Sequence, residues 1–404
     1  MRRVDHNRLM RRGTIVSSAA VLLALAAPAP LTQADTIRSQ QWYLDAMQAE
    51  EMWRTSTGSG MTVAVVDSGV DAELPDLQGQ VLPGKDFSGL EGDAHSDYDG
   101  HGTSMAVLIA GTGGGNGGAG AFGLAPKAKI LPLRVVNAKV PAPKVLPATS
   151  IAAAIRYAAD SEARIINVSM GGSFEHEDEA EAVRYAVTKG KLILAAVGNT
   201  GNERNLPEYP AAFPGVVGVA AVDQDIKATA ESQHGPQVDL AAPGDNIVAT
   251  CKGGTGLCRS HGTSDATALT SASAALLWSA HPDWTANQVL RVLINTAGGP
   301  KSGEKRSDSI GYGVVRPRIA LQNPGDPGPP DVSPLPELAA AKSPTTGNAT
   351  TGKDAAHPQA AEPEAKEDSS WLSPRNVLAV GVVATAVILA AGVSVLLARR
   401  RRAL

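Results

Sequence analysis

The stretch Met61-Thr62-Val63-Ala64-Val65-Val66, followed at once by Asp67, decides the fold. Its apolar residues run on without the polar alternation of a half-exposed strand, which is typical of a strand covered on both faces, as in a parallel sheet. Further short runs of this kind follow along the chain, at residues 163–168, 191–197 and 215–222. The sequence therefore predicts several buried parallel strands.

Segments compatible with helices separate the first three of these runs. Residues 150–160 and 178–189 have suitable lengths, and Ser150 and Asp178 are side chains that commonly cap a helix N-terminus. Strands that alternate with helices in this way form βαβ units. We therefore expect a doubly wound α/β fold, with a mainly parallel sheet and helices on both faces.

Polar or flexible residues follow the predicted strands. In open α/β sheets, ligands bind beyond the carboxyl ends of the strands. Asp67 follows the first run, and Gly198 and Asn199 follow the third. The second run is followed by four consecutive residues: Ser169, Met170, Gly171 and Gly172. These segments are expected to line one crevice.

The tetrapeptide HGTS occurs twice, at residues 101–104 and 261–264. His101 would begin a short apolar helix. Ser264 would lie at the start of a longer helix that runs to about Trp278, where unpaired backbone N–H groups and the positive helix end favour a developing anion. Serine hydrolysis needs a histidine oriented by a carboxylate and a serine that faces oxyanion donors.

Five motifs in order resemble those of the subtilisin-like serine proteases. They are VVDSGVD around Asp67, DGHGTS around His101, INVSMGG around Ser169, AAVGNTG around Asn199, and HGTSDATALTSASAALL around Ser264. The order Asp, His, Ser is that of subtilisin. The resemblance covers residues 60 to about 321 and implies a subtilisin-like α/β fold.

The resemblance also implies a role for each matching residue. Asp67 would orient His101, which would take the proton from the nucleophile Ser264 and pass it to the leaving amine. The Asn199 amide and the Ser264 backbone N–H would hold the oxyanion. The first HGTS would thus supply the base and the second the nucleophile. Substrate would pair with the edge formed by Ser169, Met170, Gly171 and Gly172, where the first side-chain pocket would open.

Simpler interpretations exist for the same residues. Asp67 could cap a helix or turn, and Asn199 could be a turn residue before Thr200-Gly201. Ser104 is expected to be a helix-start hydroxyl, and His261 a solvent-facing neighbour of the nucleophile.

The segments QWYLDAM at residues 41–47 and AEEMW at residues 49–53, which include Trp42 and Trp53, resemble the N-terminal part of the mycosins. Mycosins are membrane-anchored subtilisin-like proteases associated with type VII secretion in actinobacteria. Only about 30 residues separate the expected signal-peptide cleavage, near position 35, from Asp67, which is too few for the folded inhibitory prodomain of ordinary subtilisins. We therefore expect residues 35–59 to form an extension that lies on the catalytic domain, residues 60–322, with both tryptophans packed there. Alternatively, both tryptophans are core residues of a first helix.

The chain departs from the family pattern at two positions. Ala268 replaces the usual proline four residues after the nucleophile, which could loosen the helix start. Asp265 replaces an apolar residue and would place a negative charge beside the oxyanion site, which is unfavourable if it points inward. The acidic loop 92–99 could bind calcium, but we interpret it as a solvated loop, and no metal site is predicted.

Residues 1–34 are predicted to be a secretory signal peptide, since an arginine-rich start precedes an apolar run of roughly 13 residues and then small residues. Cleavage after Ala27, Ala29 or Ala34 fits this pattern. In an exported protein, Cys251 and Cys258 are expected to form a disulfide. The net charge of −4 gives no indication of nucleic-acid binding.

The C-terminal part predicts a membrane anchor. Residues 323–375 are rich in proline and alanine and are expected to form a disordered linker. Residues 376–398 carry no charge and match the roughly 20 apolar residues of a transmembrane helix. The basic tail, residues 399–404, would be cytoplasmic and the catalytic domain extracellular.

The sequence thus predicts a single-pass serine endopeptidase of the cell membrane with narrow specificity for protein or peptide substrates. It would be linked to a membrane-embedded secretion complex, and its chemistry needs no cofactor. Alternatively, the chain is a structural component of that complex, with dispensable proteolysis. An esterase is less favoured because the G-x-S-x-G pattern is absent around Ser264.

Overall fold

The computed structural model describes residues 36–136, 140, 143–250 and 257–335. All of them belong to the first of the two units into which the chain divides, Met1–Pro344. The predicted signal peptide, most of the linker, the predicted span 376–398 and the basic tail lie outside the described residues. Among the helices of these described ranges, none combines the length and the apolar character that a membrane span requires.

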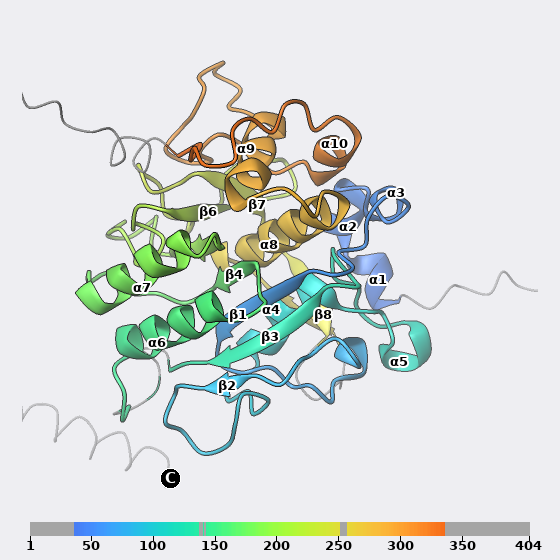
Figure 1. The fold of residues 1–404 in the computed structure, drawn as a ribbon. Helices are drawn as coiled ribbons and strands as arrows, with labels where there is room; N and C mark the ends of the chain where they lie inside the picture. The colour runs from blue at the N-terminus through green and yellow to red at the C-terminus, as the bar shows by residue number, and fades with distance from the viewer. Residues whose placement is uncertain (1–35, 137–139, 141–142, 251–256, 336–404) are drawn as a thin grey trace, which may run out of the picture. The chain divides into compact units, whose positions relative to one another are not determined.

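A parallel sheet forms the centre of the fold, with the strand order β2-β3-β1-β4-β5-β6-β7 (Figure 1). Its strands are β1 Thr62–Asp67, β2 Lys85–Asp86, β3 Lys129–Arg134, β4 Ile165–Val168, β5 Leu192–Ala196, β6 Val216–Val222 and β7 Leu240–Pro243. The predicted parallel sheet is confirmed, and its four predicted strands correspond to β1, β4, β5 and β6. Because all seven strands run in one direction, their carboxyl ends meet at one edge.

Burial on both faces explains the continuous apolar runs. In β1, Val63 and Val65 point into one core cluster and Ala64 and Val66 into the other. The first cluster contains helices α4 His101–Ala110, α8 Thr263–Ala280 and α9 Ala286–Thr296, and the second contains α6 Pro147–Asp160 and α7 Glu177–Thr188. Helices thus cover both faces of the sheet, as predicted.

Two details of the predicted helices are wrong. Ser150 lies inside α6, and Asp178 lies inside α7. The α6 helix begins earlier because Pro147 occupies its first position, where the missing N–H of proline costs nothing. The Ser150 hydroxyl instead donates to the Pro147 carbonyl, at 2.8 Å.

The N-terminal extension consists of three short helices, α1 Ile37–Gln40, α2 Trp42–Ala46 and α3 Ala49–Met52. Both tryptophans are partly buried against the first core cluster. The Trp53 indole N–H donates to the Leu124 carbonyl at 2.9 Å, and that of Trp42 to the Asn246 carbonyl at 3.1 Å. The extension is therefore packed on the domain, and its tryptophans connect it to residues far along the chain.

The first part of the predicted linker is ordered. After α10, Pro317–Gln322, residues 323–335 run along α9, where Thr285 donates to the Pro330 carbonyl and Gln288 to the Gly328 carbonyl. Leu335 is buried in the first core cluster. The packed part of the chain therefore extends at least to Leu335, because a buried leucine and side-chain donors hold the proline-rich segment.

The remaining elements are short. They are η1 Pro75–Leu77, α5 Gly115–Gly118, and an antiparallel hairpin of β8 Ile247–Thr250 and β9 Leu257–Ser260. Cys258 lies in β9, but Cys251 lies outside the described residues, so their disulfide stays a prediction.

Candidate active site

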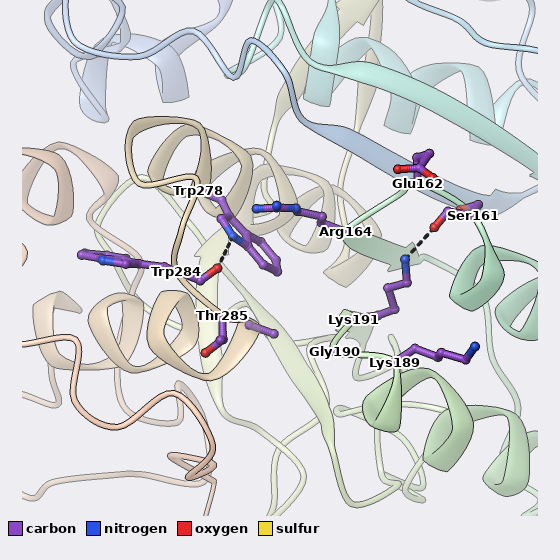
Figure 2. A pocket seen from close by; sticks show the side chains of 10 residues that line it. Ser161, Glu162, Arg164, Lys189, Gly190, Lys191, Trp278, Trp284 and Thr285 are labelled. Carbon is purple, nitrogen blue, oxygen red and sulfur yellow. Dashed lines mark hydrogen bonds between the residues drawn. The ribbon is translucent and has the colours of Figure 1, made fainter.

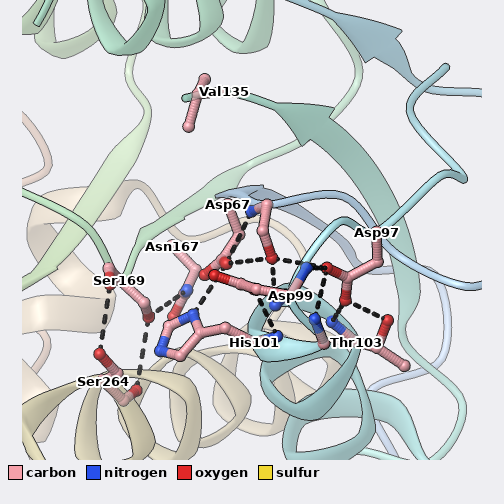
Figure 3. Close-up of polar contacts among 12 residues, drawn as sticks. Asp67, Asp97, Asp99, His101, Thr103, Val135, Asn167, Ser169 and Ser264 are labelled. Carbon is pink, nitrogen blue, oxygen red and sulfur yellow. Dashed lines mark hydrogen bonds and ion pairs between the residues drawn. The ribbon is translucent and has the colours of Figure 1, made fainter. Parts of the chain in front are cut away.

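The carboxylate of Asp67 and the imidazole of His101 are in direct contact. Asp67 ends β1 and is fully buried, and His101 begins α4. His101 Nδ1 lies 2.8 Å from Asp67 Oδ1 (Figure 3). An ionised carboxylate can only accept, so Nδ1 carries the proton and Nε2 is left to accept one. The pair has the geometry of an oriented general base.

A polar network fixes α4 beside β1. Ser68 donates to the carboxylate of Asp97 at 2.8 Å, and its hydroxyl accepts from the Gly102 N–H at 2.9 Å. The Asp97 carboxylate also accepts from the Thr103 N–H at 2.9 Å, in the first turn of the helix. The predicted acidic loop thus contributes a helix cap, because these N–H groups have no partner within the helix.

Gly102 is required for this approach. A Cβ at this position would lie 2.2 Å from the Gly69 carbonyl oxygen and 3.1 Å from Asp67 Oδ1. This glycine belongs to the HGTS motif, whereas Ser68 and Asp97 had no predicted role. Ser68 directly follows strand β1, so the rule that ligands lie beyond strand ends would have included it. Asp97 lies in the acidic loop 92–99, and only the fold shows its contact with the first turn of α4.

Ser264 lies in the first turn of α8, near the His101 ring (Figure 3). Its hydroxyl donates to the Ser169 carbonyl at 3.2 Å, and within the described residues no hydrogen bond joins it to His101. The Ser169 hydroxyl in turn lies 3.4 Å from the Ser264 carbonyl oxygen. The nucleophile would therefore have to rotate from the 169–172 segment towards Nε2, and catalytic hydrogen bonds commonly tighten only when substrate is bound.

Asn199 is oriented by the residue before the nucleophile. Its Oδ1 accepts from the Thr263 backbone N–H at 2.9 Å and from the Thr263 hydroxyl at 3.1 Å. Both are donors, so they fix the amide with its oxygen towards α8. The Nδ2 group is left to donate, which is the requirement for holding an oxyanion.

Neighbouring carboxylates control the proton affinity of the base. Burial lowers the pKa of His101, but Asp67 beside it, together with Asp265 and Asp99, raises this pKa to about 9. Burial also raises the pKa of Asp265 to about 6, although the Ser260 hydroxyl and two imidazoles oppose this. The carboxylates around His101 thus favour its protonated form, which cannot accept the proton of Ser264.

The two departures from the family pattern have different consequences. Asp265 is buried, and its Oδ1 accepts from the Ser260 hydroxyl of β9 at 2.8 Å. Its negative charge raises the pKa of His101. Ala268 is buried within α8, which runs unbroken from Thr263 to Ala280. The helix start is thus regular without proline.

The second copy of HGTS places its residues differently from the first. His261 is exposed and Ser104 is half-buried in α4. The segment 169–172 follows β4, and its first residue, Ser169, accepts from the Ser264 hydroxyl. Its last residue, Gly172, pairs with Tyr209 through two backbone hydrogen bonds of 3.1 and 2.8 Å. The structure therefore brings together Asp67, His101, Asn199, Ser264 and the 169–172 segment at the carboxyl edge of the sheet.

A pocket of about 310 Å³ lies at the opposite edge of the sheet (Figure 2). It is lined by Arg164 and Lys191, which precede strands β4 and β5, and by Trp278 near the end of α8. The Lys191 ammonium donates to the Ser161 carbonyl at 2.7 Å. Because this pocket lies at the amino ends of the strands, it is separate from the triad. No group of three or more metal-binding side chains is found in the described ranges.

Comparison with known proteins agrees with this geometry. The Subtilase family (Peptidase_S8) matches residues 58–313. Thermitase of Thermoactinomyces vulgaris is 37% identical over 260 residues, which cover 64% of this chain and 88% of thermitase.

Two solved structures of mycosins have a similar fold. MycP1, a serine protease and an essential component of the type VII (ESX-1) secretion system, has a TM-score of 0.63 and 31% identity, with 72% of this chain and 90% of that chain covered. The MycP3 protease from the type VII (ESX-3) secretion system has a TM-score of 0.62 and 32% identity, with the same coverage. Together with the family match, these likenesses show that the chain belongs to the subtilase family and is a serine protease.

Proposed function

We propose that this chain is an exported, membrane-anchored serine endopeptidase that cleaves a narrow set of proteins and is linked to type VII secretion. The observation that carries the proteolytic part is the contact of 2.8 Å between Asp67 and His101, with Ser264 beside them (Figure 3). The oriented Asn199 amide contacts Thr263, the residue before Ser264. Asp67 would hold the imidazole, His101 would move the proton, and Ser264 would attack the peptide carbonyl.

The link to secretion is supported by likeness. MycP1 and MycP3 belong to type VII secretion systems, and their structures cover 72% of this chain. The packed extension of residues 36–53 and the apolar segment 376–398 fit a protease that is exported and anchored.

Labelling with a fluorophosphonate probe tests the proteolytic part. The full-length protein is compared with Ser264→Ala and His101→Ala, and the duplicated motif provides matched controls, Ser104→Ala and His261→Ala. We expect the two controls to label like the parent and the two active-site variants to lose labelling. Equal labelling of the His101→Ala and His261→Ala proteins would contradict the assignment of the base.

Membrane anchoring requires a separate experiment. The full chain and a chain that ends at residue 375 are expressed in the producing cell, and membranes are extracted with alkaline carbonate. Retention of the full chain and release of the shorter chain are expected. Release of both would contradict an anchor at residues 376–398.

A structural role in the secretion complex is the second candidate. The observation that favours it is that the Ser264 hydroxyl donates to the Ser169 carbonyl, whereas no hydrogen bond in the described ranges joins it to His101. Replacing Ser264 by alanine in the cell distinguishes the two candidates. Loss of secretion indicates that catalysis is the function, and retained secretion with loss of proteolysis indicates a scaffold.

A further inference from the structure

The active-site geometry determines where the residue before the cleaved bond must lie. Its carbonyl carbon has to reach Ser264 Oγ, and its carbonyl oxygen has to reach Asn199 Nδ2. Ser264 Oγ contacts the Ser169 carbonyl, and the Gly198 N–H donates to the Thr263 hydroxyl at 3.3 Å. In the proposed function, the side chain of that substrate residue would lie between the segments 169–172 and 196–199, which border these two groups.

The glycines on these two segments border either open space or the side chain of Glu208. A Cβ at Gly172 would meet no atom within 4 Å, so this edge is open. A Cβ at Gly198 would lie 2.7 Å from the carboxyl carbon of Glu208, and one at Gly171 would lie 3.8 Å from Glu208 Oε2. The carboxylate of Glu208 is thus close to both segments.

Glu208 is held firmly in this position. The next residue, Tyr209, pairs with Gly172 through two backbone hydrogen bonds of 3.1 and 2.8 Å. Glu208 Oε1 accepts from Gln233 Nε2 at 2.9 Å, and the same amide group donates to the Thr200 hydroxyl at 2.8 Å. Gln233 is fully buried, and its backbone N–H donates to the Gly198 carbonyl at 3.0 Å.

The charge of Glu208 has no cationic partner in the part of the chain that the structure describes. The side chain is half-buried, and burial raises the pKa of its carboxyl although the Gln233 amide opposes this. A partly desolvated carboxylate without a counter-charge is unfavourable, so a cation that reaches it from the substrate would be stabilised.

We propose that Glu208 determines specificity, and that it selects lysine or arginine as the residue whose carbonyl is attacked. The inference deepens the proposed function and rests on it. The ammonium or guanidinium group would enter between the two segments and pair with Glu208 Oε2. Gln233 would keep Oε1 in place, so that the carboxylate is oriented before substrate binds.

Paired fluorogenic peptides test this directly. They are identical except for lysine or norleucine before the cleaved bond, because norleucine keeps the apolar stem and lacks the ammonium group. For the full-length protein we expect kcat/KM to favour lysine by about tenfold to 100-fold, as for a charge-assisted hydrogen bond in a partly buried site. Because the pKa of Glu208 is raised, this ratio should fall when the pH is lowered towards the ordinary carboxyl range.

Glu208→Gln is the matched variant, because the new amide oxygen can still accept from Gln233. It should remove the preference for lysine by lowering kcat/KM for the lysine peptide towards that for the norleucine peptide. Glu203→Gln, an exposed acid in the same loop, should change nothing. Equal cleavage of both peptides by the parent, or an unchanged lysine preference in Glu208→Gln, would overturn the inference and leave the proposed proteolytic function standing.

Binding to the Ser264→Ala protein separates the two proposals. Calorimetry with the same two peptides measures recognition without catalysis. Tighter binding of the lysine peptide supports the role of Glu208 even if the parent cleaves neither peptide, an outcome that would contradict the proposed function alone. Equal affinities would overturn the role of Glu208.

Discussion

Replacing Asp265 by asparagine should make the protease more active at neutral pH. The change removes a buried charge that raises the pKa of His101, and the amide oxygen can still accept from Ser260. Neutral imidazole is the form that accepts the proton of Ser264. The pKa of His101 therefore falls in the variant, and the acid limb of the rate profile moves to lower pH.

The magnitude follows from the pKa of about 9. At pH 7 about one imidazole in 100 is neutral, so the rate should rise about tenfold per pH unit until it levels off near the pKa. Each unit by which Asp265→Asn lowers the pKa raises the rate at pH 7 about tenfold, with a ceiling of about 100-fold. Well above pH 9 the two proteins should react equally, because both imidazoles are neutral.

The same reasoning predicts convergence at acidic pH. The Asp265 carboxyl has a pKa of about 6, so below that pH it becomes neutral in the parent as well. The difference in the pKa of His101 between the two proteins then disappears. The gain in rate is thus expected only in the window from about pH 6 to about pH 9, set by these two values.

The rate of fluorophosphonate labelling from pH 5 to 11 measures this effect without a known substrate. Asp283→Asn is the matched control, because Asp283 is exposed and lies beyond the far end of α8. This helix is about 27 Å long, which is more than the screening length of about 10 Å, so the charge of Asp283 should not affect His101. A thermal melt checks that each variant is folded. An acid limb that stays in place or moves to higher pH in Asp265→Asn would refute the reasoning.

Three further changes test the site and the fold. Asn199→Asp and Asn199→Ala both remove the amide donor and should slow labelling about 10²–10³-fold, a magnitude known from subtilisin itself. Labelling of either variant as fast as that of the parent would contradict an oxyanion role. Only Asn199→Ala leaves the Thr263 N–H without an acceptor, which costs about 1–3 kcal/mol in the free energy of unfolding. Only this variant should therefore have a lower melting temperature. Thr285→Ala removes the capping box of α9 and should cost about 1 kcal/mol in the free energy of unfolding, measured by urea titration, whereas Thr285→Ser should not. A chain that ends at Gln322 should melt below one that ends at Leu335 in a calorimetric scan, because it loses the bonds to α9 and a buried leucine; equal melting temperatures would show that the segment adds no stability.

Continuous apolar runs were sufficient to predict four strands and the parallel sheet, because only strands covered on both faces tolerate them. Strand β3 was not predicted, since Pro132 interrupts its pattern. The caps of α6 and α7 were assigned from side-chain preference, and this failed because Pro147 already sets the start of α6. The ordered segment 323–335 was also missed, because its stability comes from carbonyl contacts with α9 that composition does not show.

The sequence by itself determined the fold class, the family and the residues at the strand ends, because strand direction places Asp67, Ser169 and Asn199 at one edge. Only the tertiary structure decided how these groups face one another. It shows the Ser264 hydroxyl directed to Ser169, the Asn199 amide fixed by Thr263, and Glu208 beside Gly198. Hydrogen-bond direction, proton affinity and the position of an unpaired charge depend on contacts between residues far apart in the chain, and no local pattern in the sequence encodes them.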